Sequence, residues 1–247
     1  MDSNIPESNT KMFQVSTLQA LALGYSKQVT TVQQLLLHGD TGLGTFEDVG
    51  GEMIVLDGHC YCADENGRVK EAHPDTGVPF CSVSYMDNAR EFTLGPVPDI
   101  GTLKKKLNLK IEEDYGLNSM HMAVVSGKFE TLSARSEAAY RSHHVTLKAV
   151  LEKTQNDYTF SQITGSLVCV YYPDYMDGIN APGWHLHFIS EDRCHGGHVF
   201  GLKAENCTVK LKKISLIEIQ IPNDPTFDTY SLKKASKEEI RQVEQGH

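Results

Sequence analysis

Basic residues, cysteine and long hydrophobic runs are all scarce in this sequence of 247 residues. Lysine and arginine number 23 against 32 acidic residues, and the resulting net charge of −9 argues against nonspecific binding to nucleic acid or anionic membranes. No run approaches the roughly 18 apolar residues that cross a bilayer, and residues 1–10 lack the pattern of a signal peptide. The sequence therefore predicts a soluble, cytoplasmic protein with neither a nucleic-acid nor a membrane partner.

Cysteine is also too sparse to indicate a fold held together by disulfide bonds. Six residues in 247 fall well below the density of a disulfide-rich secreted scaffold. Cys60 and Cys62 form a Cys-x-Cys pair, but no second pair completes a four-cysteine zinc site. Four cysteines lie in stretches with a strand pattern, where a free thiol most often acts as a small core residue: Cys60, Cys62, Cys81 and Cys169. We therefore assign cysteine no part in the chemistry.

Hydrophobic residues make up 40% of the chain, which is enough to bury a sizeable core. Apolar spacing and end signals predict helices over residues 16–24, 30–38, 100–107 and 143–151. Strand patterns cover residues 52–56, 59–62, 80–86, 158–163, 167–172, 184–189, 198–202 and 207–221. Two hairpins are predicted, one at Asn66-Gly67 and one at Ser126-Gly127-Lys128, which would join strands 119–125 and 129–135.

These elements predict an α/β (α+β) fold in two parts. Residues 1–155 would form a mixed α/β domain, in which helices accompany a mixed β-sheet. Residues 156–247 would form a β-rich, metal-binding domain, an antiparallel and barrel-like sheet. The boundary falls where the mixed pattern gives way to strands alone.

A histidine pair on one predicted strand is the sharpest chemical feature. Side chains two apart on a strand share a face, so His185 and His187 point together while Leu186 and Phe188 face the core. A turn follows, and His198 on the returning strand would supply a third imidazole. Three histidines with an open fourth position are typical of a catalytic zinc site, although imidazole equally suits iron, nickel or copper.

Three alternatives to this interpretation remain open from the residues alone. His195 competes with His198 as the third ligand, since its direction within the turn cannot be read from strand alternation. A cupin-like Fe(II) dioxygenase would combine the His-x-His pair with a glutamate a few residues later, and Glu191 has nearly that spacing. A noncatalytic β-rich binding protein would use the histidines for structure only.

A glycine-dense segment, residues 39–51, precedes a glutamate at the start of a strand. The segment has neither the GK[ST] ending nor the preceding strand of a phosphate-binding loop, so nucleotide binding is not expected. Glu52 follows the tight Gly50-Gly51 turn, from which a carboxylate could be aimed inward.

Together these segments resemble the acetolactate decarboxylase family over nearly the whole chain. The resemblance is carried by HGDTGLGTF at residues 38–46, GGEMI at 50–54, PF at 79–80, DYMDGINAPGWHLHFI at 174–189, DRCHGGHV at 192–199 and IRQVE at 240–244. It implies decarboxylation of 2-acetolactate, a small-molecule substrate, to acetoin and CO2, with Zn2+ as the cofactor. Relatives of this fold pair as dimers through the N-terminal sheet, so a homodimer is also implied.

The resemblance further implies roles for single residues. His185, His187 and His198 match the zinc ligands, while Thr45 matches a threonine that lines the substrate pocket. Two glutamates match the acidic groups near the metal, of which one would donate a proton: Glu52, and Glu244 in a C-terminal tail that returns to the site.

The resemblance also implies an arginine that binds the substrate carboxylate. Arg135 occupies the corresponding position, but the sequence after Ser136 lacks the prolines and glutamine usual in the family and looks shortened. Arg141 is the alternative.

Overall fold

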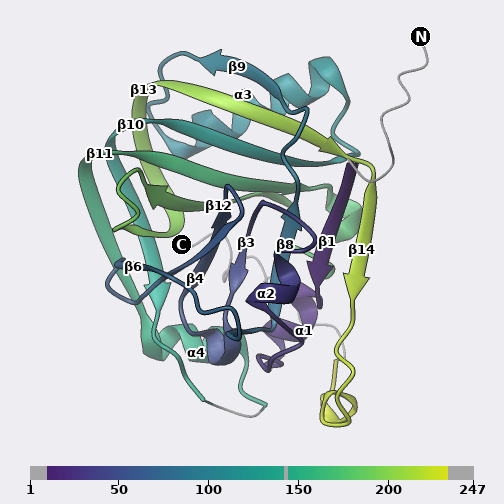
Figure 1. Ribbon diagram of the computed structural model, residues 1–247. Coiled ribbons are helices and arrows are strands. Elements are labelled where there is room, and N and C mark those ends of the chain that lie inside the picture. Colours follow the sequence, from purple (N-terminus) through teal and green to yellow (C-terminus); the bar gives the residue numbers. More distant parts are fainter. Residues whose placement is uncertain (1–9, 142–143, 233–247) are drawn as a thin grey trace.

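The computed structural model describes residues 10–141 and 144–232, and within these the fold is mostly β with few helices (Figure 1). This agrees with the α+β class expected from the sequence. One sheet of seven strands has the spatial order β14 (Leu216–Gln220), β1 (Lys11–Val15), β8 (Phe80–Ser84), β3 (Thr41–Thr45), β4 (Glu52–Leu56), β5 (His59–Ala63) and β6 (Val69–Glu71). A small additional pair consists of β2 (Thr30–Thr31) and β7 (Gly77–Val78).

The second sheet is built from the longest strands of the protein. Its order is β10 (Met120–Glu137), β11 (Gln155–Tyr172), β12 (Gly183–Ser190), β13 (Gly196–Ile214) and β9 (Arg90–Leu94). β10 is also hydrogen-bonded to β13, so the pairing path that runs through β11 and β12 returns to its starting strand. Side chains from these strands form one apolar cluster, which includes Phe129, Leu186 and Phe188.

The strand pairings do not divide the chain at residue 155. β10 lies before that position and pairs with β11 after it over almost the full length of both strands. In the other direction, β14 crosses back and lies parallel to β1 in the seven-stranded sheet. The expected boundary was placed where the sequence pattern changes, but long-range pairing joins strands from both sides of it.

The hairpin expected at Ser126-Gly127-Lys128 is wrong, because these residues continue a single strand. Ser126 and Gly127 pair with Ser166 and Gly165 of β11 without a break. A Cβ atom on Gly127 would lie 2.8 Å from the carbonyl oxygen of Asn206 on β13. This glycine therefore permits a close approach between two backbones, which the sequence pattern does not distinguish from a turn.

The other expected strands are present with changed bounds. β11 and β13 each join segments expected to be separate, β8 ends two residues early at Ser84, and the run expected over residues 207–221 divides between β13 and β14. The hairpin at Asn66-Gly67 is present between β5 and β6, with a positive φ of 71° at Gly67. Among the cysteines, Cys60, Cys81 and Cys169 are buried as expected, whereas Cys62 is half-buried.

Four helices accompany the sheets in the described residues: α1 (Leu18–Ala22), α2 (Val32–Leu35), α3 (Ile100–Asp114) and α4 (Leu147–Thr154). The Thr17 side chain caps α1 as its sequence suggests. α2 is shorter than expected, because Thr30 and Thr31 pair with β7 instead. Conversely, α3 runs seven residues beyond the expected end at Leu107, and α4 begins only after its capping residue Thr146.

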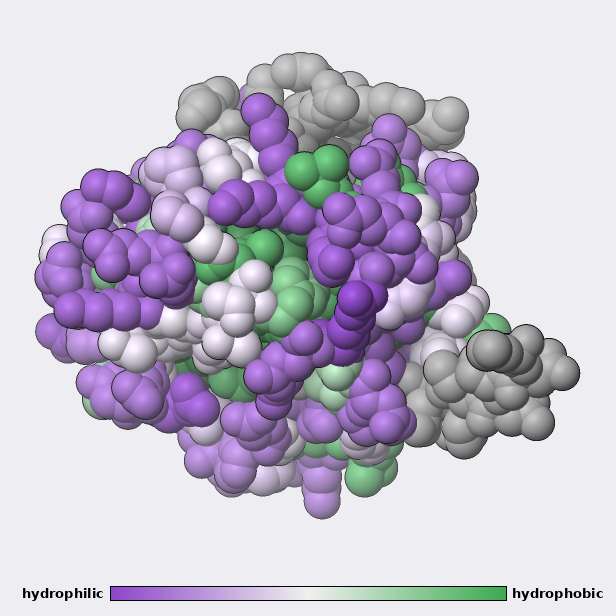
Figure 2. Space-filling model, turned by 90° about the horizontal axis from the view of Figure 1, so that it is seen from above, coloured by the Kyte–Doolittle hydropathy of each residue, from purple (hydrophilic) through white to green (hydrophobic). Residues whose placement is uncertain are grey.

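The face of the molecule seen from above is rich in hydrophilic residues (Figure 2). Seen from above, the described surface is mostly hydrophilic and surrounds a smaller hydrophobic area near the centre of that face (Figure 2). Within the described residues, no helix combines the length and apolar character needed to span a membrane.

A buried histidine away from the histidine pair makes stability depend on pH. His121 on β10 is fully buried, with the rings of Tyr115 and Tyr171 beside it and Lys213 directly across on β13. Burial lowers the pKa of His121 to about 4, and the positive charge of Lys213 acts in the same direction. The folded protein therefore resists protonation of a ring that the unfolded chain protonates near pH 6.5.

We expect His121 to destabilise the fold as the pH falls below 6.5, because only the unfolded state then gains a proton. Above pH 6.5 the ring is neutral in both states and contributes nothing. Between pH 7 and 4.5 the loss is about 2 kcal/mol, from 1.36 kcal/mol for each pKa unit. Chemical denaturation of wild type and His121→Leu at both pH values measures the change in the free energy of unfolding. The same pH dependence in both proteins would contradict the assignment.

Candidate metal centre

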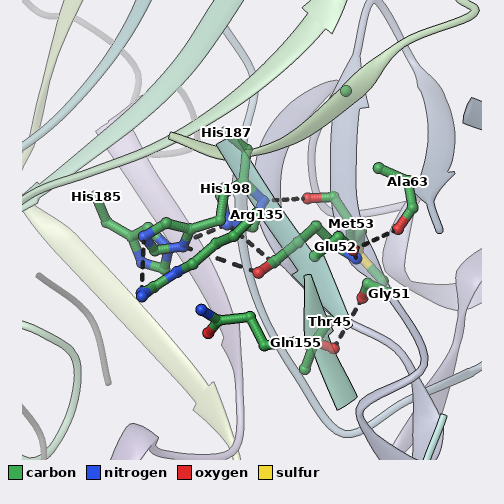
Figure 3. A network of polar contacts seen from close by, with 12 residues as sticks. Thr45, Gly51, Glu52, Met53, Ala63, Arg135, Gln155, His185, His187 and His198 are labelled. Carbon is green, nitrogen blue, oxygen red and sulfur yellow. Dashed lines mark hydrogen bonds and ion pairs between the residues drawn. The ribbon is translucent and has the colours of Figure 1, made fainter. Parts of the chain in front are cut away.

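Three imidazoles converge where β12 and β13 pair (Figure 3). His185 and His187 lie on one face of β12, and His198 of β13 is in direct register with His187. The Nε2 atom of His185 lies 3.0 Å from both His187 Nε2 and His198 Nδ1. Strand alternation and hairpin pairing thus bring together the three histidines expected from the sequence, and they form a group that could hold a metal ion.

The protonation state of these rings suits a ligand set. Burial lowers the pKa of His185 to about 3, with the Arg135 charge as the second cause. Burial also holds the pKa of His187 well below its usual range. His187 Nδ1 lies 2.8 Å from the carbonyl oxygen of Met53, which can only accept a hydrogen bond. The proton therefore sits on Nδ1, and the Nε2 lone pair faces the other imidazoles.

Two of the three spacings between the ligand nitrogens are close to those around a small tetrahedral cation. Metal–nitrogen bonds of about 2.0–2.1 Å at tetrahedral angles separate ligand nitrogens by about 3.3 Å. The His185 nitrogen lies 3.0 Å from each of the other two ligand nitrogens, close to that value. Neutral imidazoles are ligands for zinc, iron, nickel and copper, so the donor set fits a metal without selecting one.

Glu52 supplies a carboxylate directly beside the imidazoles. Its Oε2 atom lies 3.1 Å from His187 Nε2, and its Oε1 atom lies 3.9 Å from His198 Nδ1. The preceding Gly51 has a φ of 94°, and a Cβ atom there would lie 2.5 Å from the Ala63 carbonyl oxygen. Only glycine fits this turn, which starts β4 at the point where its first side chain enters the site.

Thr45 lies across from Glu52, at the paired end of β3. Its hydroxyl donates a hydrogen bond of 3.0 Å to the carbonyl oxygen of Gly51. The threonine therefore ties the end of β3 to the glycine turn that directs Glu52, and it also lines the pocket.

The structure separates the two candidate arginines. Arg135 of β10 is buried, directly in register with His198, and one terminal guanidinium nitrogen lies 3.4 Å from the Nε2 atom of that histidine. The Arg141 side chain is 87% exposed, and its Nε atom lies 3.6 Å from a carboxylate oxygen of Asp48. Arg135 is therefore the arginine placed to meet an anion beside the histidines.

A pocket with about 450 Å³ of space, counting its open mouth, joins these groups. Its polar wall includes Thr45, Glu52, Arg135, Glu137, Gln155, His185 and His198. Its apolar wall includes Leu21, Val49, Phe80, Leu147 and Leu151.

Glu137 and Gln155 were missed by sequence reasoning. Glu137 could have been found from its position two residues after Arg135, because that spacing on a strand predicts a shared face. However, the second strand of the expected hairpin ended at residue 135, so Glu137 was not assigned to a strand.

The competing candidates lie elsewhere. The ring of His195 packs against the edge of Phe160, and the group of possible metal ligands in the described residues does not include it. Glu191 is exposed and lines a separate surface pocket, so the glutamate that a cupin-like dioxygenase would require is not near the imidazoles. Glu244 lies outside the described residues.

Comparison with known proteins identifies the class of enzyme. A sequence model of the alpha-acetolactate decarboxylase family matches residues 12–234. Alpha-acetolactate decarboxylase of Brevibacillus brevis is 32% identical over 239 residues, covering 97% of this chain and 82% of its own. That of Lactococcus lactis subsp. cremoris is 33% identical, with 86% and 88% covered. The protein is thus a lyase, specifically a decarboxylase.

Solved structures agree with the sequence comparison. Alpha-acetolactate decarboxylase from Bacillus subtilis strain 168 superposes with a TM-score of 0.89 at 27% identity, covering 95% of this chain and 99% of that one. The chain belongs to the alpha-acetolactate decarboxylase family.

Proposed function

We propose that this protein is a zinc-dependent decarboxylase that converts 2-acetolactate to acetoin and CO2. One observation carries the proposal: His185, His198, Glu52 and Arg135 line one pocket, and His187 completes the group of three imidazoles beside it. Each of these groups could interact with part of this substrate, which combines a carboxylate, a hydroxyl and an adjacent ketone. Membership of the family supports the same assignment.

His185, His187 and His198 would hold the zinc ion. The metal would supply a Lewis acid for the oxygens of the substrate, where negative charge develops as CO2 leaves. The low pKa values of His185 and His187 keep these ligands neutral without competition from protons near neutral pH. The hydrogen bond from His187 to Met53 fixes the orientation of one ring before metal binds.

Arg135 would bind the carboxylate of the substrate. A guanidinium can donate two parallel hydrogen bonds to a carboxylate, which orients the bond to be broken. When the C1–C2 bond breaks, its electron pair passes into the bond between C2 and C3, and the ketone oxygen gains the charge. The ketone already present in the substrate accepts these electrons, so the reaction needs neither pyridoxal phosphate nor thiamin.

Glu52 would complete the reaction by donating a proton. C2 must gain one proton to give acetoin. A carboxylic acid beside the histidines can donate this proton and be reprotonated by solvent. Glu244 is the second candidate for this step, from the C-terminal tail that the resemblance implies. The leucines and Phe80 in the pocket wall would limit access of water.

The deciding experiment is an acetoin assay on purified protein supplied with 2-acetolactate. We expect acetoin and CO2 to form in equal amounts, with activity lost on treatment with a chelator and restored by added zinc. Metal analysis should give about one zinc per chain, from one three-histidine group. Activity that survives complete removal of metal would contradict zinc dependence, and absence of acetoin from the zinc-loaded protein would contradict the substrate.

The homodimer and the cytoplasmic location implied above remain predictions. Sedimentation of the purified protein would test the first, and fractionation of the source cells the second.

A further inference from the structure

A second carboxylate lies in the pocket near the proposed position of the substrate carboxylate. Glu137 is only 3% exposed and lines the pocket together with Arg135. The two residues are two positions apart on β10, so their side chains leave the same face of the strand about 7 Å apart. Directly across on β11 is Gln155, which also lines the pocket and is labelled in Figure 3.

The pocket that Glu137 lines also has an apolar wall. Leu147 and Leu151 come from α4 and Leu21 from α1, so two helices contribute an apolar wall to the same pocket. An apolar wall favours each additional methylene of a ligand, whereas a carboxylate disfavours contact with apolar groups. These opposite preferences meet in one small pocket.

The orientation of the substrate decides which of its groups meets Glu137. This step rests on the proposed function. With the substrate carboxylate on Arg135 and its hydroxyl and ketone oxygens toward the histidines, the alkyl group on C2 is left to contact the rest of the pocket. That alkyl group is attached one bond from the carboxylate carbon, on the carbon that carries the hydroxyl. It therefore comes within reach of the neighbour of Arg135 on the strand face, which is Glu137.

We propose that Glu137 is a specificity-determining residue, which restricts the pocket to 2-hydroxy-3-oxo acids with a short alkyl group on C2. A methyl group is too short to contact the carboxylate. An ethyl group brings its extra methylene against the carboxylate and loses the advantage that this methylene would gain against leucine. The charge also repels the carboxylate of any substrate, but this effect is common to both homologues and cancels in their ratio.

The test compares kcat/KM for 2-acetolactate with that for its homologue carrying a 2-ethyl group. We expect Glu137→Gln, which keeps the size and removes the charge, to raise the ratio of ethyl to methyl substrate about fourfold, the usual value of one buried methylene. Glu137→Asp should stay near the wild-type ratio. Glu130→Gln is the matched control, because Glu130 lies on the same strand but pairs with Lys203 at the surface.

A nonreacting pair of ligands measures the same preference without turnover. 2,3-Dihydroxy-2-methylbutanoate and 2-ethyl-2,3-dihydroxybutanoate, in which a hydroxyl replaces the ketone, differ by one methylene in the alkyl group on C2. The ratio of their inhibition constants should shift by a similar factor in Glu137→Gln. An unchanged ratio in both measurements would overturn the proposal. So would a loss of activity toward both substrates with binding of both inhibitors intact, since Glu137 would then act in the chemical step. If wild type forms no acetoin but the inhibitor ratio shifts, the proposed function fails and the selectivity of the pocket stands.

Discussion

His185→Ala should lose bound metal and with it more than about 100-fold in kcat/KM for 2-acetolactate. Changes to groups that only orient a metal ligand already cost about 10- to 100-fold in affinity or activity, so loss of a ligand should exceed that range. His185 is the most accessible of the three imidazoles, and its replacement disturbs the core less than that of His187. Metal content by mass spectrometry and acetoin formation by the purified variant provide the two measurements.

His195→Ala is the matched control for this experiment. His195 lies on the same hairpin, three residues before His198, but its ring packs against Phe160 instead of joining the group. We expect it to keep both metal and activity. Full decarboxylation by His185→Ala would exclude the three-histidine assignment, and loss of metal in His195→Ala would place the third ligand in the turn.

Arg135→Ala is expected to keep its metal and lose about 100-fold or more in kcat/KM. Two charge-assisted hydrogen bonds to a carboxylate contribute about 3 kcal/mol or more together, and each 1.36 kcal/mol corresponds to a factor of ten in rate. Steady-state kinetics with 2-acetolactate, alongside metal analysis, separates this loss from a loss of metal.

Arg141→Ala offers a control with the same change in charge. The Arg141 side chain is largely exposed and interacts with Asp48 outside the pocket, so kcat/KM should stay within about twofold of wild type. If Arg141→Ala lost activity and Arg135→Ala kept it, the substrate carboxylate would have to bind in a different place from the one proposed.

The histidine cluster could be predicted from sequence because it depends on local rules. Alternation places His185 and His187 on one face, and a short turn returns the chain opposite them, so His198 follows without knowledge of the rest of the fold. The position of Glu52 was harder to predict. The sequence indicated an inward-facing carboxylate after Gly51, but its 3.1 Å approach to His187 depends on the packing of β4 against the second sheet.

The failures of prediction share a cause in long-range pairing. Gly127 looks like a turn residue until β13 approaches it, and the two halves of β13 look like separate strands until β10 pairs with both. Glu137 and Gln155 face each other across β10 and β11, although the intervening residues include α4. Local propensity does not predict which strands pair, because pairing depends on contacts between segments that are distant in the sequence.

The position of β14 in the sequence has a consequence for folding during synthesis, because the chain emerges from the ribosome in sequence order. The nascent chain has completed every other strand of the seven-stranded sheet by residue 84, yet β14, which covers the edge of β1, is made only at residues 216–220. Between these points β1 presents an unpaired edge, a template for association with other chains. The imidazoles arrive late as well, after Thr45, Glu52 and Arg135 have all been made. Completion of the three-histidine group and protection of this edge therefore both wait for segments made after residue 184.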